Sequence, residues 1–100
     1  MNQISLLYPY HFNAAFIIEQ RSHTHPSIKK TFFKNQGARY LNFCLMVDGV
    51  MAAFSITQLV IDEANLFNIA VDPNFKRRGL GKMLLQHLID QLKARNIKTL

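Results

Sequence analysis

The residues best suited to chemistry form a short basic stretch with two glycines at positions 76–82, KRRGLGK. A helix that begins here would present unpaired N–H groups and a partial positive charge, which attract anions. Gly79 and Gly81 lack a Cβ, so backbone amides can close on a bulky group such as a pyrophosphate. Full positive charges, which match phosphate oxygens, stand beside them on Arg77, Arg78 and Lys82. The stretch therefore predicts a phosphate-binding turn.

Two well-known phosphate motifs do not fit this turn. A P-loop needs a Gly where Lys76 stands and a Ser or Thr where Met83 stands. The dinucleotide fingerprint needs a third Gly at the position of Leu84. A helix-entry loop with exposed charge is the plainer interpretation. The apolar strand and the Asp-Pro turn before the stretch, with the amphipathic helix after it, favour the phosphate site.

The elements around the turn follow from the apolar spacing. After the glycines, leucines recur at i, i+4 and i+8, which predicts a helix to about residues 95–96. Before them, residues 40–47 and 51–61 read as strands joined by an Asp48-Gly49 hairpin. A turn at 62–65 then leads to a third strand over 66–71. We expect the last residues, 98–100, to begin a further strand.

The N-terminal part predicts one strand and two helices. Residues 4–7 read as an edge strand that ends at Tyr8-Pro9. Asn13 is a candidate N-cap for a helix to about Arg21, and Ser27 for a short helix that ends at residues 35–37. The chain is therefore expected to be α+β, with most strands in one antiparallel meander.

Composition narrows the class of protein. With 100 residues, 49% of them hydrophobic and 18% charged, the chain has room for one globular domain. No apolar run is long enough to span a bilayer, and the N-terminus does not resemble a signal peptide. The lone Cys44 has no partner in the chain and is expected to be an inert core residue, which suits a reducing compartment. We expect a cytoplasmic protein.

The net charge of +6 raises the possibility of nucleic-acid binding. The basic residues occur in small groups, and only the group at 76–78 is dense, whereas a nucleic-acid backbone usually requires a continuous basic face. His23 and His25 sit at a loop without a nearby Cys, which favours a structural role over a metal site. We therefore expect a small phosphorylated cofactor and no metal.

The segments FNIAVDP (67–73) and KRRGLG (76–81) together resemble the acetyl-coenzyme-A motif of the GCN5-related N-acetyltransferases, the GNAT family. The resemblance extends over essentially the whole chain, through EQR at 19–21, NQG at 35–37, MAAF at 51–54 and DEA at 62–64. It implies the GNAT fold, a mixed and mostly antiparallel sheet flanked by helices. The chain would be the N-terminal two-thirds of one acetyltransferase domain, without the closing strands and helix.

The resemblance also implies which residues bind acetyl-coenzyme A. The pyrophosphate turn falls on Arg77, Arg78, Gly79, Leu80, Gly81 and Lys82. The pantetheine arm and the thioester carbonyl match the backbone of Ile69, Ala70 and Val71, on a strand that splays at a bulge. Lys76 stands where the family usually has Gln or Arg. Asn68, a polar residue in an apolar strand, is compatible with the bulge.

The implied reaction is acetyl transfer to the N-terminal alanine amine of small-subunit ribosomal protein eighteen. The backbone N–H near Val71 would stabilise the oxyanion, while the general base and acid of such enzymes, a Glu and a Tyr, match positions beyond Leu100. No catalytic side chain is therefore predicted within the chain. We expect it to bind cofactor, to have little activity alone and to be prone to dimerise through an open sheet edge. The alternatives are a non-catalytic coenzyme-A-binding or interaction module and a basic nucleic-acid binder.

Overall fold

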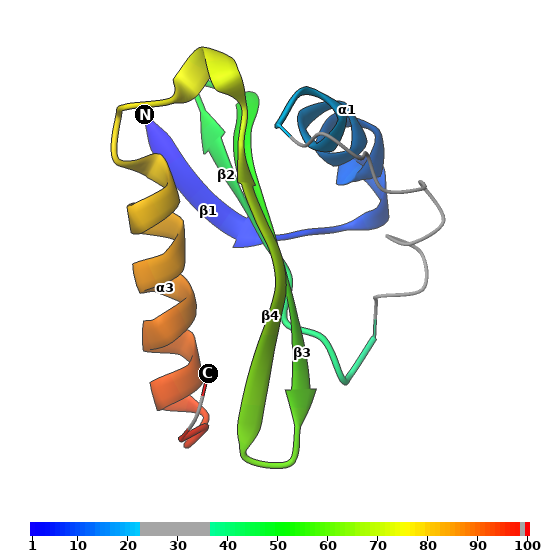
Figure 1. Ribbon diagram of the computed structural model, residues 1–100, viewed down its shortest axis with the longest axis vertical. Helices are drawn as coiled ribbons and strands as arrows, with labels where there is room; N and C mark the ends of the chain where they lie inside the picture. The colour runs from blue at the N-terminus through cyan, green and yellow to red at the C-terminus, as the bar shows by residue number, and fades with distance from the viewer. Residues whose placement is uncertain (23–36, 99) are drawn as a thin grey trace.

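Figure 1 shows a computed structural model of the chain, which describes residues 1–22, 37–98 and 100. The second predicted helix, at 27–36, and both histidines of the predicted loop lie outside the described residues. The described part has two helices, α1 and α3, on opposite faces of one sheet. It is an α+β layout, as the sequence predicts.

The sheet contains four antiparallel strands in the order in which they occur along the chain. They are β1 (Asn2–Leu6), β2 (Phe43–Val47), β3 (Val50–Val60) and β4 (Glu63–Val71). The predicted hairpin joins β2 to β3, and both of its turn residues have positive φ, 51° at Asp48 and 84° at Gly49. That pair of angles is typical of the tight turn whose twist matches a β-hairpin. Strands β1 and β4 form the two edges of the sheet.

Helix α1 (Phe12–Ser22) covers one face of the sheet. Phe12, Ala15 and Ile18 are buried against apolar side chains of β3 and β4, including Phe54. The prediction that Asn13 caps this helix is wrong, because the chain enters it through a 3₁₀ turn, η1 (Pro9–His11). In that turn the Tyr8 N–H donates to His11 Nδ1 at 2.9 Å, so the imidazole ring takes the place of a capping side chain.

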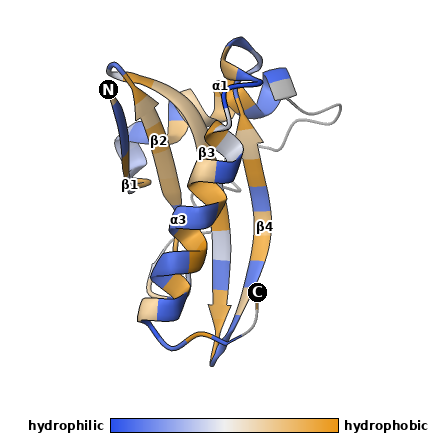
Figure 2. Cartoon of the chain, turned by 90° about the vertical axis from the view of Figure 1, so that its left-hand side faces the viewer, coloured by the Kyte–Doolittle hydropathy of each residue, from blue (hydrophilic) through white to orange (hydrophobic). Residues whose placement is uncertain are grey.

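Helix α3 (Leu80–Ala94) covers the other face, close to its predicted bounds. Its buried side chains all lie on one stripe, and Figure 2 shows hydrophobic and hydrophilic segments alternating along α3 in front of the sheet. The buried side chains are Leu80, Leu84, Leu88 and Leu92. No helix in the described part of the chain is long and apolar enough to cross a membrane.

The strand predicted at 98–100 is not formed at Lys98 or Leu100. After α3 the chain turns at Asn96, which has φ 59°, and the Ile97 N–H donates back to the Leu92 carbonyl at 2.9 Å. The Lys98 N–H donates to the carbonyl of Asp62 in the β3–β4 turn at 2.9 Å. A strand needs a ladder of such bonds, and this contact only brings the chain back to the start of β4.

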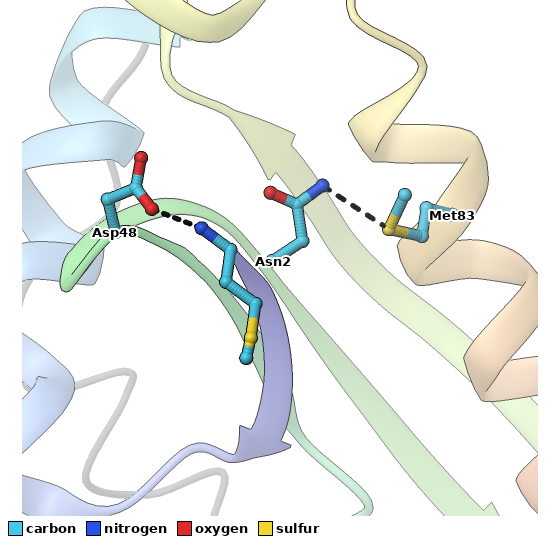
Figure 3. A network of polar contacts seen from close by, with 4 residues as sticks. Asn2, Asp48 and Met83 are labelled. Carbon is cyan, nitrogen blue, oxygen red and sulfur yellow. Dashed lines mark hydrogen bonds and ion pairs between the residues drawn. The ribbon is translucent and has the colours of Figure 1, made fainter.

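The N-terminus is held between the β2–β3 turn and α3 (Figure 3). The Met1 amine forms an ion pair with the Asp48 carboxylate, and the Asn2 amide lies 3.9 Å from the sulfur of Met83. The hydrogen bond and the charge of the amine both lower the pKa of Asp48. Because this pair is exposed to solvent, it sets the position of the chain end more than it stabilises the fold.

Candidate functional site

Strand β4 carries a bulge two residues before the predicted thioester-binding segment. Ile56 of β3 is opposite Asn68, but its neighbour Thr57 is opposite Leu66, so Phe67 has no partner position on β3. An extra residue of this kind bends a strand and increases its twist. The bulge that the family resemblance implies is therefore present, and it lies at Phe67.

The bulge also determines which side chains face α3. Ala64 and Leu66 pack in the core under α3, and Ile69 and Val71 pack there too, although Leu66 and Ile69 are an odd number of residues apart. Strict alternation along a strand would place Ile69 and Val71 on the α1 face. The extra residue shifts the alternation by one, so that Ala70 faces α1 between them.

Beyond β4 the chain is fixed by the carboxylate of Asp72, a residue that is only 5% exposed. The side chain accepts a hydrogen bond from the Asn74 N–H at 2.9 Å and thereby caps the 3₁₀ turn η2 (Pro73–Phe75). The backbone N–H of Asp72 donates to the Ala52 carbonyl of β3 at 2.8 Å. On its other side the carboxylate pairs with Arg21 of α1 at 3.1 Å. The path from the end of β4 into η2 is thus held from three directions.

The two glycines of the turn are favoured for different reasons. Gly79, the residue before α3, has φ 74°, a left-handed conformation that side chains with a Cβ disfavour. Gly81 lies in the first turn of α3, where a Cβ would come within 3.2 Å of the Val71 Cγ2 atom. Arg77 also has a positive φ of 67°. The turn is therefore tightly curved, and α3 begins in close contact with the last residue of β4.

An open cleft of about 480 Å³ lies between the end of β4, η2 and the first turn of α3. Residues of these elements and of the turn between η2 and α3 line it, namely Ile69, Ala70, Val71, Phe75, Lys76, Arg77, Gly79, Leu80 and Gly81. The lining is apolar on the strand side and carries the cations of Lys76 and Arg77 on the turn side. Such a cleft suits a ligand with an extended arm at one end and phosphates at the other.

The structure brings most of the predicted cofactor residues to this cleft. The exceptions are Arg78 and Lys82, which do not line it. The Arg78 guanidinium lies 5.2 Å from the ring centroid of Phe75, a cation–π contact, and Lys82 is exposed on α3. That these residues bind a coenzyme stays a prediction.

Sequence reasoning missed Phe75 as a lining residue and Asp72 as an anchor. It also missed a buried carboxylate on α1, Glu19, which accepts a hydrogen bond from the Asn68 amide. The available signal was the presence of polar residues in stretches that otherwise read as core, because a buried polar group requires a partner. The partners come from distant parts of the chain, so the sequence does not identify them.

Other nucleophilic or metal-binding groups of the described residues do not form a second site. Cys44 is buried, its Sγ lies 3.4 Å from the Ser5 hydroxyl, and burial raises the pKa of the thiol, which disfavours the reactive thiolate. Burial also lowers the pKa of neighbouring His11. Within residues 1–22, 37–98 and 100, no group of three His, Cys, Asp or Glu side chains could hold a metal ion.

Comparison with known proteins gives one consistent family. The family model described as the acetyltransferase (GNAT) family matches residues 6–100. The chain is 62% identical over all 100 residues to the [ribosomal protein bS18]-alanine N-acetyltransferase of Salmonella typhimurium, of which it covers 68%. The crystal structure of the ribosomal-protein-S18-alanine N-acetyltransferase from Escherichia coli is 59% identical, with a TM-score of 0.95. That match covers 97% of this chain and 63% of the other.

A more distant structure shows the fold alone. The PaiA N-acetyltransferase from Thermoplasma acidophilum, crystallised in complex with coenzyme A, is 13% identical with a TM-score of 0.86. The match covers 97% of this chain and 75% of that one. The chain thus spans about two thirds of the length of the curated relative it matches, and the described sheet and helices are part of the GNAT fold. From the family match over nearly all its residues, the chain belongs to the GNAT family of acetyltransferases.

Proposed function

We propose that the chain belongs to an enzyme that transfers an acetyl group from acetyl-coenzyme A to the N-terminal alanine amine of ribosomal protein bS18. The observation that carries this proposal is the 62% identity, over the whole chain, to a relative with that name. The cleft at the end of β4 supports it, because its apolar strand side and basic turn fit the two ends of the coenzyme. A non-catalytic binding module or a nucleic-acid binder is not favoured.

The two sides of the cleft would perform different tasks. The backbone of Ile69–Val71 would bind the pantetheine arm, and residues 77–82 would bind the pyrophosphate through the first turn of α3 and its flanking cations. Because the Asp72 N–H pairs with β3, the alternation of an antiparallel ladder directs the Val71 N–H to the opposite side of β4. A donor in that position suits the thioester oxygen as negative charge develops on it.

Proton transfer requires further groups. The α-amine must lose a proton before it attacks the thioester carbonyl, and the thiolate that leaves must gain one. Among the described residues that line the cleft, none is a carboxylate or a tyrosine. We therefore propose that the polypeptide of residues 1–100 binds acetyl-coenzyme A but transfers acetyl groups slowly or not at all.

Amide hydrogen exchange tests the cofactor site. Acetyl-coenzyme A is expected to protect the amides of residues 69–71 and 77–82, whereas a short RNA is not. Protection by the RNA and not by acetyl-coenzyme A would overturn the proposal in favour of a nucleic-acid binder. Acetyl transfer is measured separately with a peptide that carries the bS18 N-terminus, against the same peptide with an acetylated amine. Fast turnover would support bS18 as the substrate and refute the proposed low activity of residues 1–100.

The compartment and the assembly are also proposals. The lone, buried Cys44 suits the cytoplasm. The outer edge of β4 before the coenzyme-binding segment, which no described strand covers, favours a homodimer through edge-to-edge pairing. Size-exclusion chromatography with light scattering tests the dimer, and a monomer at all concentrations would refute it.

A further inference from the structure

Helix α1 contacts the cofactor strand through two charged side chains, one on each side of the thioester-binding segment. Glu19 accepts a hydrogen bond from the side-chain amide of Asn68, the residue before Ile69. Arg21 Nη1 pairs with Asp72 Oδ2 at 3.1 Å, and Asp72 is the residue after Val71. The three residues proposed to bind the pantetheine arm are thus bracketed by two polar contacts to a single helix.

The Glu19 contact is unusual for its burial. The residue is only 3% exposed, and a carboxylate removed from water is costly unless hydrogen bonds compensate. Asn68 directly follows the bulge residue Phe67, where the ladder to β3 is interrupted. The contact to α1 therefore holds β4 at the point where its backbone hydrogen bonds to β3 are interrupted. The Glu19–Asn68 hydrogen bond lies at the residue where β4 resumes regular pairing with β3.

The Arg21 contact holds the other end of the segment. Asp72 is buried and also caps η2, whereas the Arg21 side chain is half exposed. Loss of the guanidinium would leave the carboxylate with a weaker set of partners, and the path from β4 to η2 would be less fixed. Neither contact touches the glycine turn or the first turn of α3.

We propose that Glu19 and Arg21 are positioning residues that hold the Ile69–Val71 backbone in place for the pantetheine arm. This inference rests on the proposed function. It requires that the two contacts affect recognition of the arm and leave recognition of the phosphates nearly unchanged, because the phosphate side is built from position 76 onward. The two parts of the coenzyme can be separated by ligand: adenosine 3′-phosphate 5′-diphosphate carries the phosphates and lacks the arm.

The central variant is Asn68→Asp, which places a second carboxylate against Glu19. We expect the Kd for acetyl-coenzyme A to rise about tenfold, the cost of one broken buried contact, and the Kd for the arm-less ligand to change less than about twofold. Addition of Glu19→Gln should restore acetyl-coenzyme A binding, because the Gln amide can donate to the carboxylate introduced at position 68. Isothermal titration calorimetry measures both ligands.

A second variant keeps the test valid if Asn68→Asp does not fold. Arg21→Ala removes a half-exposed side chain and is expected to have the same selective effect, with Arg21→Lys intermediate. The matched control is Gln86→Ala, which removes an exposed side-chain hydrogen bond to Asp90 on α3 and should change neither Kd. Thermal unfolding of each variant shows whether the fold is retained.

The outcomes separate the two proposals. Selective weakening with rescue supports the positioning role. Equal weakening for both ligands, or no rescue by Glu19→Gln, overturns it and leaves the contacts a general structural role. If the unmodified chain binds acetyl-coenzyme A no better than the arm-less ligand, the proposed function of Ile69–Val71 fails instead.

Discussion

At the scale of single residues, the turn depends on glycines for reasons that the sequence suggests only in part. The lack of a Cβ predicts a close approach, and the structure shows that at Gly81 the close neighbour is the Val71 side chain. At Gly79 the space is open, and the constraint is the backbone angle. Motif knowledge identifies both positions, but the φ of 74° at Gly79 and the contact to β4 require the folded chain.

Substitution at Gly79 tests the backbone constraint. Gly79→Ala should destabilise the protein by about 1 kcal/mol, since the left-handed conformation is disfavoured with a Cβ, and Gly79→Asn should cost less because Asn tolerates that region. Urea denaturation followed by circular dichroism gives the free energies of unfolding. The matched control is Gly49→Asn in the β2–β3 turn, because Gly49 also has a positive φ. If Ala and Asn are equivalent at position 79, the angle is not the constraint.

At the scale of elements, the meander, the hairpin and α3 follow from periodicity and turn residues. The strand period of two and the helical leucine spacing are strong local signals, so they predict the bounds of these strands and of α3 within a few residues. The prediction that Asn13 caps α1 is wrong, because the chain enters the helix through η1, in which the Tyr8 N–H donates to the His11 ring. Local propensity does not capture such a contact, nor does it locate the bulge at Phe67.

Two variants at the bulge separate the effect of the Phe67 side chain from the effect of the extra residue on the strand register. Deletion of Phe67 would restore regular alternation and turn Ile69 and Val71 away from the core under α3. We expect this deletion to abolish acetyl-coenzyme A binding and to lower the unfolding temperature strongly. Phe67→Ala is the matched control, since it keeps the extra residue and removes a side chain that is 51% exposed. It should bind nearly as well as the unmodified chain.

The unfolding temperature and the Kd for acetyl-coenzyme A of both variants separate the effect of the strand register from that of the Phe67 side chain. Because Phe67 also packs edge-on against Tyr40, a small loss of stability in Phe67→Ala is compatible with the bulge as the cause. Equal losses of binding in the two variants would show instead that the aromatic side chain matters and the register does not.

At the scale of the whole molecule, the net charge of +6 has two interpretations. It could act as a general positive field, or the cations of the basic turn could act locally on a bound anion. Composition does not separate the two, since both give the same total. The structure places Lys76 and Arg77 in the lining of one cleft, with Arg78 and Lys82 exposed in the same stretch of chain, whereas Lys93 and Arg95 are exposed at the far end of α3.

Salt dependence with two charge-matched variants decides between these interpretations. Screening of exposed charges should raise the Kd for acetyl-coenzyme A several-fold between about 0.05 M and about 0.5 M KCl. The pair Lys76→Gln/Arg78→Gln should weaken binding at low salt and flatten the salt dependence, because it removes local cations. The pair Lys93→Gln/Arg95→Gln lowers the net charge by the same amount and should leave the slope unchanged. If both pairs flatten the slope equally, the charge acts as a field over the whole molecule, and the turn has no particular role in holding phosphate.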